Sequence, residues 1–232
     1  MKLFIPRKKI KGVGNVVEAG KNIKLKCKIN GNNNKIIIEN GSKYGKDFNF
    51  IINISGDNNK IIIKEPYNVK KLRIVVGMQV PVSGASIYID ALTSIVDVNV
   101  LAFQHGSKLN IGKNCMFSND IQIRTGELPH FIFDRETGEY LDKSSIVNIG
   151  DDCWIGEGAF ILKNASIASN NIVGSKSVVT KRFDEKYTVI AGNPAQVKKR
   201  NVEWVRNLSI LDDYQVYKNS FNRYLAEVGG II

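Results

Sequence analysis

The sequence predicts a mainly β protein, built as a parallel β-helix with one extruded loop and a C-terminal helix. Isoleucine or valine recurs every six residues over 149–179, and the fifth residue of each hexad is mostly small. A period of six fits neither an α-helix nor a plain strand. It predicts short strands that turn and stack coil on coil. The inward positions are Ile149, Ile155, Ile161, Ile167, Val173 and Val179.

Residues 1–104 are expected to form irregular β coils that continue into the regular helix. The segment GNNNKIII at 31–38 recurs as GDNNKIII at 56–63, an offset of 25 residues. Glycine, asparagine and aspartate tolerate positive φ and form turns, and the isoleucine runs are typical of buried strands. No proline-rich or serine-rich linker separates this part from the rest of the chain.

The positive charge is concentrated in the first third of the chain. Residues 1–75 carry 17 Lys/Arg and 5 Asp/Glu, a balance of +12, whereas residues 76–232 carry 16 and 17, a balance of −1. Such a field attracts anionic polymers or surfaces. The alternative interpretation is a set of solvated strand faces in a lysine-rich chain.

Residues 105–200 are expected to form the regular core, interrupted by a loop at 124–145. Hexads begin near Ile111, continue at Phe117 and Ile123, and resume at Ile149. The gap of 26 residues between Ile123 and Ile149 is not a multiple of six. A segment of about 8, 14 or 20 residues must therefore leave the stack, and excursions from a rigid scaffold are where function concentrates.

Residues 201–232 are expected to form a helical cap on the last coil, since apolar residues recur at helical spacing from about 201 to 227. On the coils, the residues that directly precede inward positions should point outward; these are Trp154, Phe160, Ser166, Ile172 and Val178. With three hexads per coil, Trp154 and Ile172 share one face. Apolar outer faces favour self-association, and a three-sided prism suggests a homotrimer.

Several classes of protein are disfavoured. The first 12 residues contain no apolar core of a signal peptide, and no apolar run approaches the roughly 18 residues of a membrane span. The three cysteines, Cys27, Cys115 and Cys153, have no metal-type spacing, and two of them fill small hexad positions. We therefore expect no metal and a reduced, cytoplasmic setting.

Three segments resemble one family. IRTGELPH at 123–130 resembles the histidine-bearing loop of bacterial capsule and O-antigen O-acetyltransferases, IGDDCWIG at 149–156 resembles their tryptophan-bearing coil, and AGNPA at 191–195 resembles their terminal turn. The match covers about 105–200. It implies the left-handed β-helix of hexapeptide-repeat acetyltransferases, with acetyl-CoA as donor. The extra residue before His130, with Leu128 and Pro129, departs from the family loop, but the spacing to Trp154 resembles the sialic-acid-capsule branch.

The resemblance implies a general base on the loop. The chain has two histidines, His105 and His130, and only His130 lies on the extruded segment. An imidazole suits proton abstraction from a hydroxyl near neutral pH. Glu127, Asp134 or a backbone carbonyl would orient it. Trp154 is expected at the acetyl or acceptor end of the site, or else packs in an interface.

Residues 176–200 carry 7 Lys/Arg and 2 Asp/Glu, which suits the phosphates of CoA. The expected CoA-binding residues are Lys181 and Lys198 for phosphate, Gly174 and Ser175 for the pantetheine arm, and Pro194 for adenine.

The favoured function is O-acetylation of a sugar hydroxyl on a bacterial surface polysaccharide, with an anionic and sialylated acceptor as one possibility and no nucleic-acid partner. The alternatives are a nucleotide-sugar N-acetyltransferase on the same fold, and a non-enzymatic β-helical binding or scaffold protein.

Overall fold

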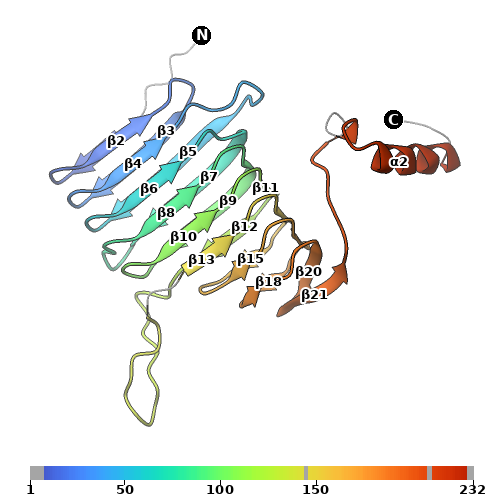
Figure 1. The fold of residues 1–232 in the computed structure, drawn as a ribbon. Coiled ribbons are helices and arrows are strands. Elements are labelled where there is room, and N and C mark those ends of the chain that lie inside the picture. Colours follow the sequence, from blue (N-terminus) through green and yellow to red (C-terminus); the bar gives the residue numbers. More distant parts are fainter. Residues whose placement is uncertain (1–7, 144–145, 208–210, 229–232) are drawn as a thin grey trace. The chain divides into compact units, whose positions relative to one another are not determined.

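The computed structural model describes residues 8–143, 146–207 and 211–228. Residues 1–202 form one compact unit and residues 203–232 form a second. The first unit is a parallel β-solenoid, which confirms the predicted fold class (Figure 1).

Two long sheets run the length of the solenoid, and every strand pair in them is parallel except β20 with β21. The first sheet holds β1 (Lys8–Lys11), β3 (Lys24–Asn30), β5 (Phe48–Ser55), β7 (Asn68–Val76), β9 (Ser94–Ala102), β11 (Met116–Phe117), β12 (Ile121–Arg124), β14 (Trp154–Ile155), β15 (Phe160–Ile161), β17 (Ile172–Val173), β18 (Val178–Val179), β20 (Thr188–Gly192) and β21 (Ala195–Arg200). The second holds β2 (Val16–Ala19), β4 (Lys35–Ile38), β6 (Lys60–Ile63), β8 (Ser86–Ile89), β10 (Lys108–Ile111), β13 (Ile146–Ile149), β16 (Ser166–Ile167) and β19 (Arg182–Phe183).

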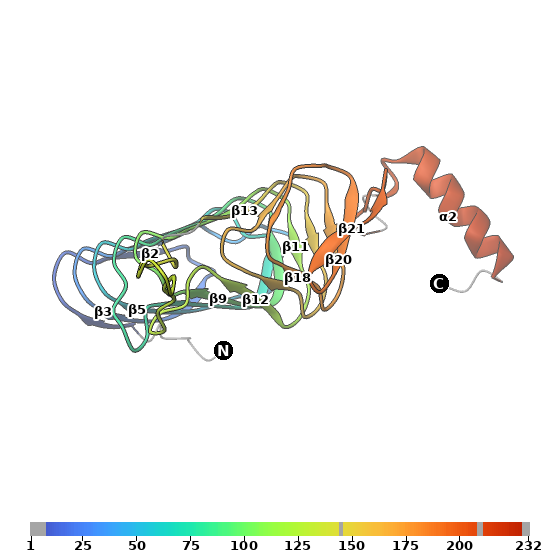
Figure 2. The ribbon, with the colours of Figure 1, turned by 90° about the horizontal axis from the view of Figure 1, so that it is seen from below.

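The solenoid changes from two-sided to three-sided coils at β9. From β3 onward, each earlier coil consists of one long strand followed by one short strand, as β3 is followed by β4 and β5 by β6. The first half of β9 pairs with β11 and its second half pairs with β12. The long outer strand is thereby replaced by two short strands separated by a corner. Figure 2 shows the narrow N-terminal coils widening toward the C-terminal ones.

The core confirms the six-residue register. The inward isoleucines and valines from Ile111 to Val179 are buried, and so are the small fifth positions, including Cys115, Cys153 and Asn171. The Cys115 thiol contacts that of Cys153, and this contact together with burial raises the pKa of Cys115 well above its ordinary value. The two cysteines therefore pack as small core residues.

Asparagines at the turn before β4 and β6 form a buried ladder. The side-chain amide of Asn59 donates to Asn34 Oδ1 at 2.9 Å and to the Val82 carbonyl at 2.8 Å. Asn34 donates in the same way to Asn15 Oδ1 at 3.0 Å and to the Gly56 carbonyl at 2.9 Å. This ladder explains the repeat at 31–38 and 56–63: each copy supplies one amide that closes a turn and binds the next coil.

The isoleucine runs of that repeat are only partly buried. Ile36 and Ile38 face the core on β4, while Ile37 points outward and is half-buried, and β6 shows the same pattern. Period-two alternation in a two-sided coil sends the middle isoleucine to the surface.

The excursion from the regular coils is 20 residues long. Strands β13 and β16 align Asn148 with Ser166, 18 residues apart, whereas β10 and β13 align Asn110 with Asn148, 38 apart, and 38 − 18 = 20. Of the three lengths that the sequence allowed, the structure selects the longest.

The C-terminal helix is shorter than expected. Helix α2 spans Gln215–Glu227, and the segment from Asn201 to Asn207 is not helical. Asn201 has φ 57°, and the Val202 N–H donates to the Tyr187 carbonyl, so the chain leaves β21 in an extended form that excludes Trp204 from the helix. The expected covering of the last coil stays a prediction. No described helix is long and apolar enough to cross a membrane.

Removing one member of the asparagine ladder should destabilise the solenoid. Asn59→Ala leaves the buried Asn34 carbonyl oxygen, the Val82 carbonyl and the Ala85 N–H without their side-chain partner. We expect a loss of about 2–4 kcal/mol in unfolding free energy, measured by urea denaturation. Asn49→Ala is the control, since the exposed Asn49 amide makes one bond to the Lys70 carbonyl, and it should cost under about 1 kcal/mol. Equal losses in the two variants would refute the structural role of the ladder.

Candidate functional site

Two edges of the solenoid matter for the site. The turns between β9 and β10, β12 and β13, β15 and β16, and β18 and β19 stack on one edge, here called the loop corner. The turns between β14 and β15 and between β17 and β18 stack on a second edge, here called the glycine corner, where Gly156 and Gly174 lie.

At the loop corner the 20-residue excursion forms a hairpin that projects from the solenoid (Figure 1). Its two arms meet at an antiparallel bridge between Phe133 and Tyr140. Asp134 closes the tip, because its Oδ1 accepts hydrogen bonds from the Thr137 N–H at 2.7 Å, the Thr137 hydroxyl at 3.0 Å and the Glu136 N–H at 2.9 Å. These bonds, those of Thr137 first, lower the pKa of Asp134.

Buried polar contacts fix the root of the hairpin. The carboxylate of Asp142, which is 2% exposed, pairs with the Lys163 ammonium from the next coil. The Gln104 amide donates to the Tyr140 hydroxyl at 2.9 Å and to the Asp142 carbonyl. On the other arm, the Leu128 N–H donates to the Phe103 carbonyl at 3.2 Å. The hairpin is thus tied to the coils before and after it.

His130 lies on the first arm and is exposed. Its backbone N–H donates to the Glu127 carbonyl at 3.0 Å, in the turn that contains Pro129. The Glu127 carboxylate pairs with the Arg124 guanidinium at 2.9 Å. Both carboxylates expected near the histidine, Glu127 and Asp134, therefore have other partners in the isolated chain.

The second histidine, His105, lies at the loop corner one coil earlier and is also exposed. Its Nδ1 accepts the backbone N–H of Ser83 at 3.2 Å.

Trp154 lies on β14, half-buried, and its indole N–H donates to the Ser118 hydroxyl at 3.3 Å. Strand register stacks it between Met116 and Ile172 on one outer face, as expected. In a closed three-sided coil, the corner that joins two faces lies opposite the third face. The hairpin leaves between the β12 and β13 faces, so the corner from which it starts lies opposite the face that carries Trp154.

The residues expected to bind CoA lie in three places on the solenoid. Gly174 and Ser175 lie at the glycine corner, beside Ala191: a Cβ atom on Gly174 would come within 2.9 Å of the Ala191 Cβ. Lys198 lies over Gly192, which precedes Pro194 in the turn between β20 and β21. Lys181 is separate from these, because it lies at the loop corner with its ammonium 5.5 Å from the Phe183 ring.

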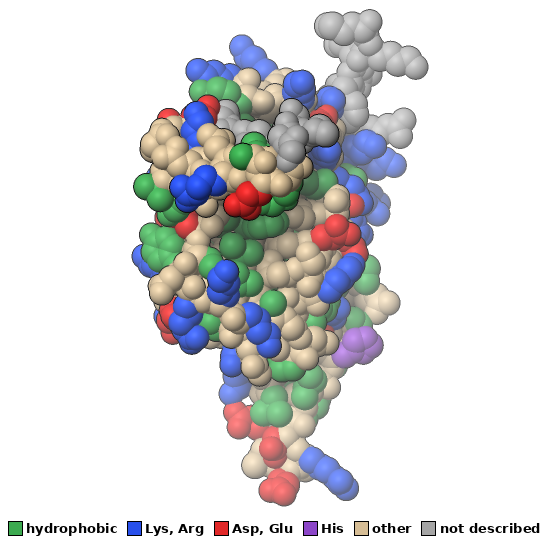
Figure 3. Space-filling view, turned by 90° about the vertical axis from the view of Figure 1, so that its right-hand side faces the viewer, with side chains coloured by type: hydrophobic (Ala, Val, Ile, Leu, Met, Phe, Trp, Pro, Cys, Tyr) green, Lys and Arg blue, Asp and Glu red, His purple; other side chains and the backbone are tan. Residues whose placement is uncertain are grey.

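Large apolar side chains on the hairpin are exposed. Phe131 is 60% exposed, and Ile132, Phe133 and Leu141 are exposed to a similar degree. The rings of Phe133 and Tyr140 lie 5.5 Å apart, and Phe131 stacks on Phe133 at 6.4 Å. Figure 3 shows hydrophobic side chains on the projecting part above a charged tip. A contiguous apolar surface of this kind is typical of an interaction site.

Three residues of the site were missed by the sequence reasoning: Gln104, Asp142 and Lys163. Each is a common surface residue type with no motif around it, and only the pairing of coils brings the three together. The 38-residue coil spacing was the available signal, since it places Gln104 and Lys163 on the edge from which the loop leaves.

Residues 146–181 match the bacterial transferase hexapeptide family, with six repeats. A polysialic acid O-acetyltransferase of Neisseria meningitidis is 33% identical over 126 residues, which are 54% of this chain and 58% of that protein. The chain spans about half the length of the curated relatives it matches.

Two crystal structures resemble the whole solenoid. The polySia-specific acetyltransferase NeuO superposes with a TM-score of 0.76 at 27% identity, over 94% of this chain and 97% of that one. The polysialic acid O-acetyltransferase OatWY gives 0.58 at 26% identity, over 91% and 98%. The resemblance to hexapeptide-repeat acetyltransferases, in the polysaccharide O-acetyltransferase branch, is confirmed.

Loss of the buried pair at the hairpin root should loosen the hairpin. Lys163→Met leaves the Asp142 carboxylate buried without its cation, and we expect a loss of about 3 kcal/mol in unfolding free energy with faster proteolysis within 131–141. Lys143→Met removes the exposed partner of Glu139 and should cost under about 0.5 kcal/mol. An unchanged cleavage rate in Lys163→Met would show that this pair does not hold the hairpin.

Proposed function

We propose that this chain, whose regular coils carry the bacterial transferase hexapeptide repeat, is an acetyl-CoA-dependent O-acetyltransferase that modifies a sugar hydroxyl of an anionic bacterial surface polysaccharide. One observation carries the proposal: the otherwise regular coils are interrupted once, by a hairpin that holds an exposed histidine at a fixed root. The two superposed structures and the Neisseria relative, all named as acting on polysialic acid, support the substrate class.

In the proposed reaction His130 is the general base. Its imidazole takes the proton of the acceptor hydroxyl while the sugar oxygen attacks the thioester carbonyl of acetyl-CoA. The C–S bond then breaks, and the imidazolium returns the proton to the CoA thiolate. Positioned general bases of this kind contribute about 10²–10⁴-fold to a rate.

A backbone carbonyl or a carboxylate must orient the imidazole. In the isolated chain Asp134 closes the hairpin tip and Glu127 pairs with Arg124. Of the two, Glu127 is the better candidate, because its contact with Arg124 is partly exposed and lies in the same turn as His130. Asp134 instead accepts the hydrogen bonds that close the turn at the hairpin tip.

The proposed site needs a second copy of the chain. The hairpin that carries His130 starts at the corner opposite the Trp154 face, so a shared site forms where the hairpin of one protomer meets the Trp154 face of its neighbour. The exposed apolar residues of the hairpin and the apolar column of Met116, Trp154 and Ile172 are the surfaces such a contact would bury. Repetition of this heterologous contact around a three-fold axis gives a homotrimer.

Acetyl-CoA supplies the activated acetyl group, and the glycine corner has the features to hold its extended arm. Gly156 and Gly174 carry no side chain at this edge because the coils pack closely there: a Cβ on Gly156 would lie 2.7 Å from the Ser175 backbone nitrogen. The edge is therefore free of projecting side chains at these two positions, and an extended arm could lie along it. Lys198 and Pro194 lie at the end of the same edge for phosphate and adenine, and Lys181 would reach the phosphates from a neighbouring protomer. We place the reaction in the cytoplasm, in keeping with the three free cysteines.

Removal of the imidazole should abolish most of the transfer. We expect His130→Ala to lower kcat for acetyl transfer to polysialic acid by about 10²–10⁴-fold, measured as base-labile acetate on the polymer. His105→Ala is the control and should retain near-normal kcat, since that ring binds the Ser83 backbone. Near-normal transfer by His130→Ala would rule out this mechanism, and base-stable acetate would indicate N-acetylation.

The shared site predicts complementation between two inactive variants. When His130→Ala and Trp154→Ala chains are unfolded, mixed in equal amounts and refolded, a site is intact if one chain supplies the histidine and the next supplies the tryptophan. Random assembly into trimers makes about one quarter of the sites intact. Activity near that level supports the shared site, whereas a site within one chain gives no recovery.

A further inference from the structure

The N-terminal coils carry a basic groove on their outer surface, separate from the hairpin itself. It has a volume of about 460 Å³ and is lined by strands β1, β3, β5 and β7 near their C-terminal ends. Lys9, Lys11 and Lys28 are exposed along it, and Arg73 is half-exposed. Strand register brings these side chains into rows: Lys9 lies beside Lys28, and Lys11 lies beside Asn30.

Both polar and apolar side chains line the groove, the apolar ones being Ile29, Ile54, Val75 and Met78. Asn53 and Ser55 from β5 offer amide and hydroxyl groups between the cations. On β7, Val75 aligns with the outward Asn53 yet is only 3% exposed, and Gly77 and Met78 line the groove beside it. The chain that follows β7 therefore gives the groove a wall.

The four cations of the groove lack carboxylate partners. Among residues 8–143, 146–207 and 211–228, none of Lys9, Lys11, Lys28 and Arg73 has an Asp or Glu oxygen within 4.0 Å. By contrast Lys71, on the same strand as Arg73, pairs with Asp97 at 2.8 Å. Four unneutralised charges around one concave surface concentrate counter-anions there.

This groove lies on the same edge of the solenoid as the hairpin. Backbone hydrogen bonds link the turns of that edge in series: the Gly31 N–H donates to Lys11, Gly56 to Asn30, Gly77 to Ala102 and Thr125 to Leu101. From β3 to β12 there are four strand spacings, through β5, β7 and β9. Each spacing is 4.7–4.9 Å, so β3 in the groove lies about 19 Å from β12, the strand that leads into the hairpin.

We propose that this groove is a second binding site for a carboxylated, polyanionic glycan, which holds the polymer while one of its sugars lies at His130. The inference rests on the proposed function for the identity of the reacting sugar, but the groove itself binds without any transfer. Lys9, Lys11, Lys28 and Arg73 bind carboxylates spaced along the chain, and Asn30, Asn53 and Ser55 bind hydroxyl groups between them.

The side chains of the groove favour a glycan over a single-stranded nucleic acid. Proteins that bind single-stranded nucleic acids combine cations with aromatic side chains on which bases stack. The residues that line this groove include no aromatic ring. Amide, hydroxyl and cationic groups instead match the hydroxyl and carboxylate groups of an acidic sugar.

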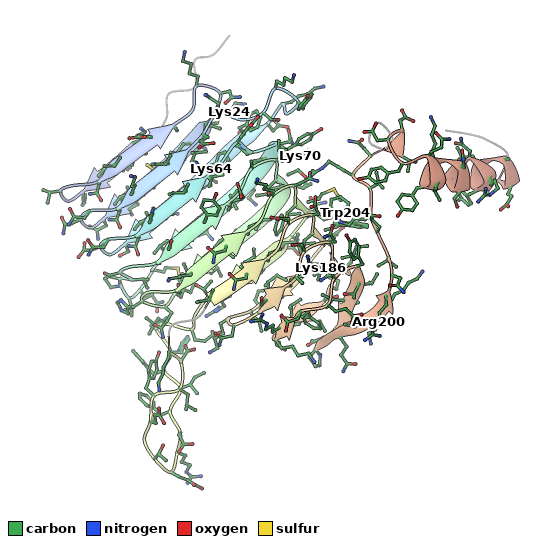
Figure 4. The ribbon with its side chains drawn as sticks, viewed as in Figure 1. Lys24, Lys64, Lys70, Lys186, Arg200 and Trp204 are labelled. Carbon is green, nitrogen blue, oxygen red and sulfur yellow. The ribbon has the colours of Figure 1, made fainter. Side chains whose placement is uncertain are left out.

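The test compares two double variants on the same strands. Lys28→Gln with Arg73→Gln removes two groove cations, whereas Lys24→Gln with Lys70→Gln removes two exposed lysines from β3 and β7 at the ends remote from the groove. Figure 4 shows Lys24 and Lys70 at the end of the strands opposite the hairpin. Both variants lose two positive charges, so a difference between them cannot come from net charge alone.

Binding is measured by calorimetry in the His130→Ala background with long polysialic acid, dextran and single-stranded DNA as probes. We expect the groove variant to raise the Kd for polysialic acid about 5–20-fold and the control variant to raise it less than about 2-fold, with no binding of dextran. In chains that retain His130, the groove variant should raise KM for the polymer and leave turnover of disialic acid unchanged.

Equal weakening in both variants would overturn the proposal, because it would reduce the effect to net charge. An unchanged Kd in the groove variant would do the same, and groove-dependent binding of DNA as tight as that of polysialic acid would reassign the groove to nucleic acid. Groove-dependent polysialic acid binding without any acetyl transfer would support the groove and remove the proposed enzyme activity. Acetyl transfer to the polymer that is unaffected by the groove variant would support the proposed enzyme activity and overturn the role of the groove.

Discussion

The structure depends on one constraint: each coil must satisfy its backbone hydrogen bonds and bury its apolar residues against the coils before and after it. Parallel pairing in register fulfils both requirements, since an inward isoleucine such as Ile155 stacks on Phe117 of the preceding coil and Val173 of the next. A single coil has no other neighbours in the solenoid, so stability is shared along the stack. The same constraint forces every functional side chain to a corner or to an outer face.

Much of the fold was predictable from the sequence because the repeat is strict. The inward positions, the small fifth residues and the outward neighbours follow from counting by six. The two-sided N-terminal coils were less predictable, since their turns vary in length and their closure depends on asparagine side chains that bond only across coils. Helix α2 was placed too early, because apolar spacing from Trp204 resembles a helix while Asn201 turns the chain and Val202 bonds to Tyr187.

For the site, the sequence located the excursion and its histidine but not their supports. The break in the register marks where a segment must leave, and His130 is the histidine on it. The buried contacts of Gln104, Asp142 and Lys163 depend on which coils are neighbours, and residues 38 and 21 positions apart become adjacent only after folding. The separation of the hairpin corner from the Trp154 face was likewise hidden, because 24 residues of sequence do not reveal opposite sides of a prism. The two-sided coils extend the edge of turns from which the hairpin leaves. The groove and the hairpin that carries the histidine therefore lie on the same edge of the solenoid.

The 38-residue coil has a wider consequence. Its strands pair in the same register as those of the 18-residue coil that follows. The pairing of the coils is therefore independent of how many residues leave at the loop corner. Loop closure costs rise only slowly with length, about 0.6 kcal/mol for each doubling. Segments of different length and sequence can therefore be exchanged at this corner during evolution or by design, while the scaffold keeps its geometry. Under the proposed function, acceptor choice could in this way diverge without redesign of the core.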